Sequence, residues 1–298
     1  MVTKEKPTIE RYLHQEGENW EKMKRELKPL VKLISSSHDE YSLQLRDDYF
    51  NIYYQGNSVA KVEPNKNGTY SVSIHREFIS AGMYEKLDEY SLIKHPAGIK
   101  SIGKYIRFRV KAKDLHAFFQ RGHLNNISSK IRAVHNGEEI TMEQVIVTDN
   151  HPSHDFIIID RQVADHLNLS RVDLLALKRD STNTFHFVVI EVKLGRNSEL
   201  RQKAGKQVSD YMKHIRENMD AYIKCYQRNY LQKKQLGLFP EETPDSIELN
   251  KDTASVEGIV VACGYSNLAE QNIRSLKNTM HENRWNFEIR QMPKMQLS

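Results

Sequence analysis

Three nearly continuous apolar segments in the second half of the chain limit the folds that this sequence can adopt. They cover residues 156–160, 172–177 and 185–192, and short polar loops separate them. A long helical stretch over about residues 198–235 follows, then a fourth apolar segment at residues 256–263, a helix over 268–282 and a strand around 285–290. Strands without polar alternation are typical of a central sheet that helices cover on both faces. The pattern of strands and helices in the second half of the chain therefore predicts an α/β fold.

The first half of the chain has a different pattern. A helical stretch over about residues 9–35 precedes short alternating segments at residues 41–46, 49–54, 58–62, 69–74 and 105–110, with turn residues such as Gln55-Gly56-Asn57 between them. Alternation with period two and turns of this kind predict an antiparallel meander. Another helical stretch, over residues 112–135, comes next, and the apolar pattern changes near Gly137.

These patterns divide the chain into two regions. We assign residues 1–112 to a helical lead-in with a β-meander, and residues 113–298 to the α/β domain, in which a short helix over residues 141–149 precedes the first apolar strand. Two roles remain open for the N-terminal region: substrate recognition, or oligomerisation as in a homodimer.

The composition argues against several functional classes. The chain has no run of the roughly 18 apolar residues that a transmembrane helix needs, and its charged N-terminus lacks the apolar core of a signal peptide. We therefore expect a cytoplasmic protein without a membrane partner. Cys225 and Cys263 are far apart and form no CxxC pair, which argues against a disulfide framework or a zinc site. The absence of a GxxxxGK(S/T) phosphate loop and of a GxSxG motif argues against an NTPase or a serine hydrolase.

A carboxylate and an ammonium group stand together at the end of the third apolar segment. Glu191 and Lys193 are two residues apart, so both point to one face of the strand and Val192 points to the other. A hairpin would place Asp173, at the start of the preceding strand, beside Glu191. The alternative is an ion pair on an exposed edge strand. Two buried carboxylates suit Mg²⁺ or Mn²⁺, and a metal site of this kind can hydrolyse phosphodiester bonds.

This arrangement resembles a known signature. Asp173, followed by a hairpin and then by Glu191 and Lys193, is similar to the active-site motif of the PD-(D/E)XK, or restriction-endonuclease-like, nuclease superfamily. The order of a helix, three strands, a helix and a strand also matches the core of that family. Val172 stands where the family name has proline, which is frequently absent in relatives.

A second motif follows on the next predicted helix. Gln207 and Tyr211, one helical turn apart, resemble the Gln-x-x-x-Tyr motif of RecB-type nucleases, in which the two residues lie near the metal and contact the nucleic-acid backbone. The family often has an acid on the helix before the core sheet. Glu143 is the first candidate for it, with Glu139 and Glu138 behind it. The resemblance covers about residues 136–290 and leaves the N-terminal region unexplained.

The resemblance implies a mixed central sheet flanked by helices, preceded here by the β-rich N-terminal region. It also implies a Mg²⁺- or Mn²⁺-dependent nuclease, with DNA as the expected substrate. The expected catalytic residues are Asp173, Glu191, Lys193, Gln207 and Tyr211. The expected metal ligands are Asp173, Glu191 and Glu143, and the expected nucleic-acid contacts are Gln207, Tyr211, Lys203 and Lys206. Endonuclease and exonuclease action both remain open, and the alternative is a non-catalytic nucleic-acid-binding or assembly protein with the same fold.

Charge along the chain gives only local support for a polyanionic partner. The net charge is +5, from 44 basic and 39 acidic residues. Residues 201–234, however, hold nine Lys or Arg against three acids. This helical stretch, which includes Lys203 and Lys206, would face phosphates, and a solvated helix face is the alternative.

Overall fold

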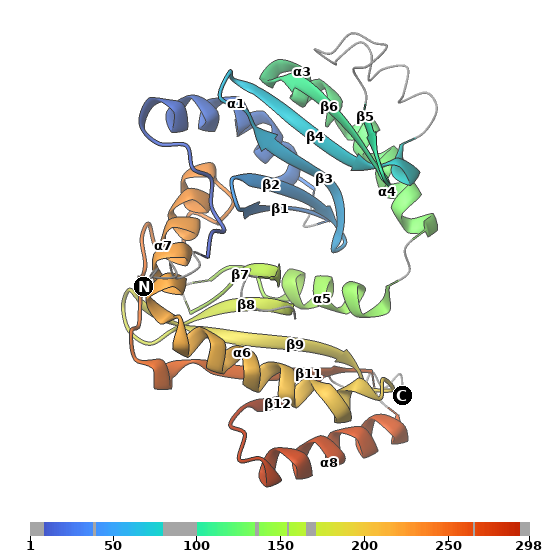
Figure 1. The fold of residues 1–298 in the computed structure, drawn as a ribbon, viewed down its shortest axis with the longest axis vertical. Coiled ribbons are helices and arrows are strands. Elements are labelled where there is room, and N and C mark those ends of the chain that lie inside the picture. The colour runs from blue at the N-terminus through green and yellow to red at the C-terminus, as the bar shows by residue number, and fades with distance from the viewer. Residues whose placement is uncertain are drawn as a thin grey trace, which may run out of the picture. The chain divides into compact units, whose positions relative to one another are not determined.

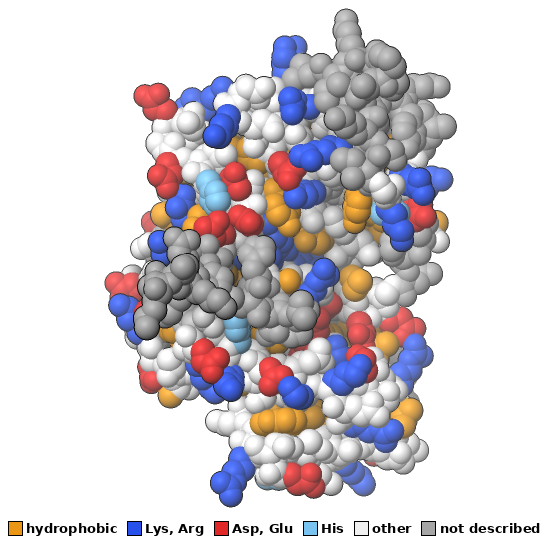
Figure 2. Space-filling model, viewed as in Figure 1, with side chains coloured by type: hydrophobic (Ala, Val, Ile, Leu, Met, Phe, Trp, Pro, Cys, Tyr) orange, Lys and Arg blue, Asp and Glu red, His pale blue; other side chains and the backbone are white. Residues whose placement is uncertain are grey.

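Two separate sheets organise the chain. The computed structural model describes residues 9–37, 40–79, 100–134, 137–153, 155–164, 171–264 and 266–292 (Figure 1). The described residues form two compact units. Residues 10–137 and 231–239 form one, which we call the N-terminal unit, and residues 138–230 and 240–292 belong to the other, the C-terminal unit. On the face of the molecule seen in Figure 2, basic and acidic side chains are interspersed.

The sheet of the N-terminal unit is antiparallel throughout. Its strands are β1 (Tyr41–Arg46), β2 (Tyr49–Tyr54), β3 (Asn57–Pro64), β4 (Thr69–His75), β5 (Lys100–Ile102) and β6 (Tyr105–Lys111), in the order β1-β2-β3-β4-β6-β5. Gln55 and Gly56 both have positive φ, as a tight two-residue hairpin turn requires. The predicted β-rich N-terminal region is confirmed.

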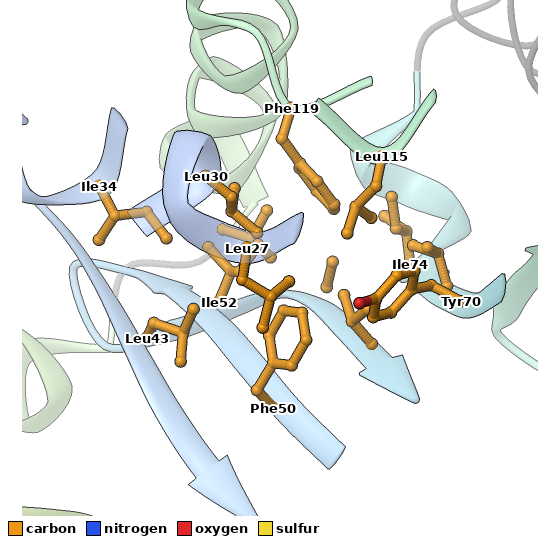
Figure 3. Close-up of a cluster of buried hydrophobic side chains, with 14 of the residues drawn as sticks. Leu27, Leu30, Ile34, Leu43, Phe50, Ile52, Tyr70, Ile74, Leu115 and Phe119 are labelled. Carbon is orange, nitrogen blue, oxygen red and sulfur yellow. The ribbon is translucent and has the colours of Figure 1, made fainter. Parts of the chain in front are cut away.

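Helix α1 (Gly17–Ser35) covers one face of this sheet. Leu27 and Leu30 point toward Phe50 and Ile52 of the strands, and Figure 3 shows these side chains meeting in one apolar cluster. All four are almost completely buried. The short 3-10 helix Arg76–Phe78 follows β4, and Phe78 is buried in the same cluster.

The boundary between the units lies after Gly137 rather than after residue 112. Helices α3 (Ala112–Phe118) and α4 (Arg121–Val134) follow β6 directly, and Leu115, Phe119 and Ile127 belong to the apolar cluster of the N-terminal unit. Residues 231–239 also belong there, since Leu236 lies in the same cluster. Burial of these helices therefore extends the N-terminal unit beyond the meander.

The C-terminal unit has a mixed sheet, as predicted. Its strands are β7 (Phe156–Val163), β8 (Val172–Arg179), β9 (Thr184–Leu194), β10 (Glu248–Leu249), β11 (Glu257–Cys263) and β12 (Glu288–Gln291). The order is β12-β11-β9-β8-β7, with β10 beside β9. Strands β7, β8 and β9 are antiparallel, whereas β11 is parallel to β9 and β12 is parallel to β11.

Helices cover both faces of this sheet. Helix α5 (Glu138–Asp149) packs Met142 and Ile146 against Ile190 and Val192 of β9. A short π-helix (Leu200–Ala204) and α6 (Gly205–Glu217) follow β9. Helix α6 runs along that strand in Figure 1. The remaining helical segments are α7 (Met219–Leu236), the 3-10 helix Thr253–Ser255 and α8 (Asn267–Glu282). None of the helices among the described residues has the length and apolar character to cross a membrane.

The predicted helix over residues 198–235 is interrupted. Asn218 separates α6 from α7, and both its backbone N–H and its side-chain amide donate to the carbonyl of His214. An Asn side chain can compete for backbone hydrogen-bonding groups in this way, which favours a helix end. Two helices therefore follow β9 instead of one.

Candidate active site

The register of β8 and β9 places the three residues of the predicted signature together. Leu174 pairs with Ile190, so Asp173 comes opposite Glu191 at the next position. The carboxylate of Asp173 accepts a hydrogen bond of 2.8 Å from the backbone N–H of Val192. The Nζ atom of Lys193 lies 2.7 Å from Oε1 of Glu191 and 3.9 Å from Oδ2 of Asp173.

Burial sets the electrostatics of this cluster. The side chain of Glu191 is 1% exposed and that of Asp173 is 14% exposed. Burial and the charge of Asp173 raise the pKa of Glu191 to about 8, against the opposing effect of Lys193. Burial also raises the pKa of Asp173, although Lys193 and the Val192 N–H oppose it. Burial lowers the pKa of Lys193, but the two carboxylates outweigh this and the net shift is upward.

The donor set fits a hard divalent cation. Oε2 of Glu191 is buried and has no hydrogen-bond partner among the described residues, so the carboxylate can still accept a ligand. Within the described residues, only Glu10, His14 and Asp47 form a trio of possible ligands whose atoms all lie within 4.8 Å of one another. No three carboxylates of the predicted site therefore converge this closely, and the register of β8 and β9 sets Asp173 opposite Glu191. Oxygen ligands of this kind suit Mg²⁺ or Mn²⁺.

Helix α5 brings Glu143 to the same region, held by two residues of β7. The side-chain amide of Gln162 donates to both oxygens of Glu143, at 2.9 and 3.0 Å, and Nη2 of Arg161 lies 3.4 Å from Oε2. Burial and the charge of Asp173 raise the pKa of Glu143 to about 7. Both carboxylate oxygens of Glu143 are thus already engaged by side chains of the protein.

Sequence reasoning missed Arg161 and Gln162. Arg161 is 1% exposed and donates to Gln144, and its own backbone N–H donates to Asp160. Gln162 has a φ of +48°, and the pairing of β7 with β8 is irregular between Ile158 and Asp160. The sequence does contain a signal for these residues, because three polar residues, Asp160, Arg161 and Gln162, directly follow the apolar residues 156–159. The partners of these residues, however, come from distant helices: α5 supplies those of Arg161 and Gln162, and Tyr226 of α7 donates to Asp160.

One turn before Glu143, Glu139 also reaches the cluster. Its Oε2 lies 4.0 Å from Nζ of Lys193, and its Oε1 accepts hydrogen bonds from the backbone of Leu194 and from the side chain of Asn197. Glu138 instead is exposed and pairs with Arg196. Two of the three candidate acids of α5 therefore lie close to the predicted signature.

Helix α6 covers the sheet face that carries Glu191. Gly258 of β11 pairs with Val189 of β9, which lies two residues from Glu191 and on the same face. A Cβ atom on Gly258 would lie 2.5 Å from Val208 Cγ1 and 2.5 Å from Met212 Sδ, so α6 packs directly on this face.

The second predicted motif lies on this helix. Tyr211 is buried with the other inward residues of α6, and Oε1 of Gln207 is buried without a hydrogen-bond partner among the described residues. The two lysines are exposed, and each pairs with an acid four residues away: Lys203 with Glu199 and Lys206 with Asp210. Charge on this part of the helix is therefore largely balanced.

Comparisons with known proteins leave the family open. No protein-family model matches the chain, and no curated protein matches it. A solved structure of EndoMS in complex with double-stranded DNA is similar at 15% identity, over 86% of this chain and 78% of that chain, with a TM-score of 0.25. A TM-score this low supports no assignment of function.

Proposed function

We propose that the protein is a metal-dependent nuclease of the PD-(D/E)XK type that hydrolyses phosphodiester bonds of DNA. The observation that carries this proposal is the buried cluster of Asp173, Glu191 and Lys193 at the ends of two paired strands. Burial of two adjacent carboxylates is costly, because each opposes the ionisation of the other. A role in binding a cation explains why the two carboxylates lie buried side by side.

Each residue has a distinct role in the proposal. Asp173 and Glu191 hold a Mg²⁺ or Mn²⁺ ion, and Glu143 contributes to the same site while Gln162 and Arg161 fix its position. A bound ion of this kind polarises the phosphoryl oxygen and lowers the pKa of the attacking water. Lys193, protonated beside Glu191, stabilises negative charge on the phosphoryl group or orients the water.

The residues of α6 contribute to substrate binding in this proposal. Gln207 has a buried amide oxygen without a hydrogen-bond partner in the part of the chain that the structure describes, and Tyr211 lies on the same side of the helix. We propose that the two side chains orient the nucleic-acid backbone beside the metal. Lys203 and Lys206 add phosphate contacts at the exposed side, where their ion pairs with neighbouring acids exchange easily.

Cleavage assays on single variants test this function. Glu191→Ala and Lys193→Ala are expected to abolish cleavage of linear or circular DNA in Mg²⁺, as EDTA does for the wild type. Glu288→Ala and Arg290→Ala are matched controls, because these residues form an exposed ion pair of 2.8 Å on β12 of the same sheet. Circular dichroism checks that each variant is folded. Full activity of either site variant would overturn the assignment.

Metal binding separates the nuclease from the alternative, a non-catalytic nucleic-acid-binding or assembly protein with the same fold. Titration calorimetry with Mn²⁺ is expected to show a saturable site in the wild type and to lose it in Asp173→Ala. A wild type without any saturable site would favour the non-catalytic protein. Parallel incubations with single-stranded RNA test whether DNA is the preferred substrate.

A further inference from the structure

The outer face of the N-terminal sheet is basic along β6. Residues of this strand alternate between buried and exposed: Ile106, Phe108 and Val110 are buried in the apolar cluster under α1, and the residues between them are exposed. The exposed residues, in order, are Tyr105, Arg107, Arg109 and Lys111. One side of the strand therefore builds the core, and the other presents three cations to solvent.

The register of the sheet extends this surface over two neighbouring strands. Lys61 of β3 pairs with Ser73 of β4, which in turn pairs with Arg107 of β6. Since directly paired residues share a face, Lys61 lies on the same side as the cations of β6. In the next row, Ser71 of β4 pairs with Arg109. Strand β4 thus adds the partly exposed hydroxyl of Ser73 between the long basic side chains, whereas Ser71 is buried and hydrogen-bonded to Asn65. We call Lys61, Arg107, Arg109 and Lys111 the β6 face.

Acidic side chains only partly neutralise this surface. Glu63, which shares a row with Ser71, contacts both Lys61 and Arg107, at 2.8 and 2.5 Å. Arg109 and Lys111 form no salt bridge with any residue that the structure describes. After β9, by contrast, Lys203 of the π-helix and Lys206 of α6 each form an ion pair with an acid four residues away. The β6 face therefore carries a local excess of positive charge, whereas the overall charge of the chain is nearly balanced.

We propose that the β6 face binds the phosphate backbone of the DNA substrate, so that the N-terminal unit serves as its docking surface. This proposal rests on the proposed nuclease function, and it selects recognition over oligomerisation as the role of the N-terminal region. Alternate residues of a strand are spaced about 7 Å apart, so the cations of β6 form a regular row. Arginine forks and serine hydroxyls are common phosphate ligands. Such contacts bind DNA without reading its sequence.

Binding without cleavage tests the proposal. The affinity of a fluorescent DNA duplex is measured by anisotropy in EDTA at several salt concentrations, for the full chain and for a triple variant, Arg107→Gln, Arg109→Gln and Lys111→Gln. Each phosphate contact contributes about 0.9 to the slope of log affinity against log salt concentration. Loss of three contacts is expected to reduce the slope by about 2 to 3 and to raise Kd about tenfold or more near 0.1 M salt.

A matched control removes the same charge from the other side of the same sheet. Arg25, Lys28 and Lys32 are exposed on α1, which packs on the opposite face. The triple variant Arg25→Gln, Lys28→Gln and Lys32→Gln has the same net charge as the test variant. Its Kd is expected to stay within about twofold of the wild-type value, apart from long-range effects that salt screens. Urea unfolding of both variants checks that the N-terminal unit remains folded.

The outcomes distinguish this proposal from the proposed function. If the test variant binds DNA with wild-type affinity and salt slope, or if the control loses as much affinity, the docking proposal is overturned even when the wild type cleaves DNA. If the test variant loses binding and the control does not, the proposal is supported, even when no metal-dependent cleavage is found. A wild type that binds no DNA would overturn the docking surface, and cleavage assays would still report on the active site.

Discussion

Replacement of Glu191 by glutamine is expected to stabilise the metal-free protein while abolishing the proposed nuclease activity. Glutamine has nearly the same shape as a protonated glutamic acid but cannot ionise. Burial and Asp173 raise the pKa of Glu191 from an ordinary value of 4.5 to about 8. The folded state therefore holds this proton over a pH range in which the unfolded chain has already lost it.

Proton linkage gives the sign and size of this stability difference between the wild type and the glutamine variant. The contribution of Glu191 to stability is fully present below pH 4.5 and is lost as the pH rises through about 8. Each pKa unit corresponds to about 1.4 kcal/mol, so ionisation of Glu191 costs the metal-free fold up to about 4 kcal/mol at pH 8. The glutamine variant avoids this cost. At pH 5 the difference is expected to fall below about 1 kcal/mol, since this pH lies only slightly above the ordinary pKa of 4.5 that applies in the unfolded chain.

Urea unfolding in EDTA at pH 5 and pH 8 measures the effect, with Glu288→Gln as an exposed control. The glutamine variant at Glu191 is expected to unfold at a higher urea concentration than the wild type at pH 8 and at a similar one at pH 5. The reasoning fails if this variant is less stable at pH 8. In that case the Glu191–Lys193 contact would act mainly as a structural ion pair, whose loss leaves Lys193 buried with less compensation.

Three further predictions concern the surroundings of the site. Arg161→Met removes donors from Glu143 and Gln144 and is expected to destabilise the fold by about 3 to 5 kcal/mol in urea unfolding; an unchanged midpoint would contradict the buried network. Gly258→Val pushes a side chain into α6 and is expected to cost about 1 to 3 kcal/mol by thermal unfolding, whereas Gly122→Ala, with open space around its Cβ, should have little effect. Saturating Mn²⁺, at one hundred times its Kd, is expected to stabilise the wild type by about 2.7 kcal/mol. Asp173→Asn should remove this gain in a thermal-shift assay, and an equal gain in both proteins would place the ion elsewhere.

The strands of this protein and part of its candidate site could be predicted from local sequence pattern. The apolar segments and the Gln55-Gly56 turn specify where strands begin and end, and the period of two places Glu191 and Lys193 on one face. The position of Asp173 opposite Glu191 required only the assumption that the two strands form a hairpin. These features depend on a few neighbouring residues, and for that reason the sequence reveals them.

Other features depend on tertiary contacts. No local pattern specifies that Gln162 adopts a positive φ and turns its amide to Glu143, or that α3 and α4 pack under the N-terminal sheet. The two lysines of the helical segment after β9 are an intermediate case. Lys203 and Lys206 each have an acid at helical spacing in the sequence, so their pairing was predictable, although the count of basic residues alone concealed it.

Charge balance explains why these partners belong to one site. Four carboxylates, those of Glu139, Glu143, Asp173 and Glu191, lie with two cationic side chains, Lys193 and Arg161, in one connected set of contacts and charge interactions. When all are ionised, the set has a surplus of two negative charges. The pKa values of three of the four, Glu143, Asp173 and Glu191, are raised, chiefly by burial, and repulsion from a neighbouring carboxylate adds to each shift. One divalent cation would neutralise the set completely, and it would also offset the carboxylate repulsion that adds to the upward pKa shifts.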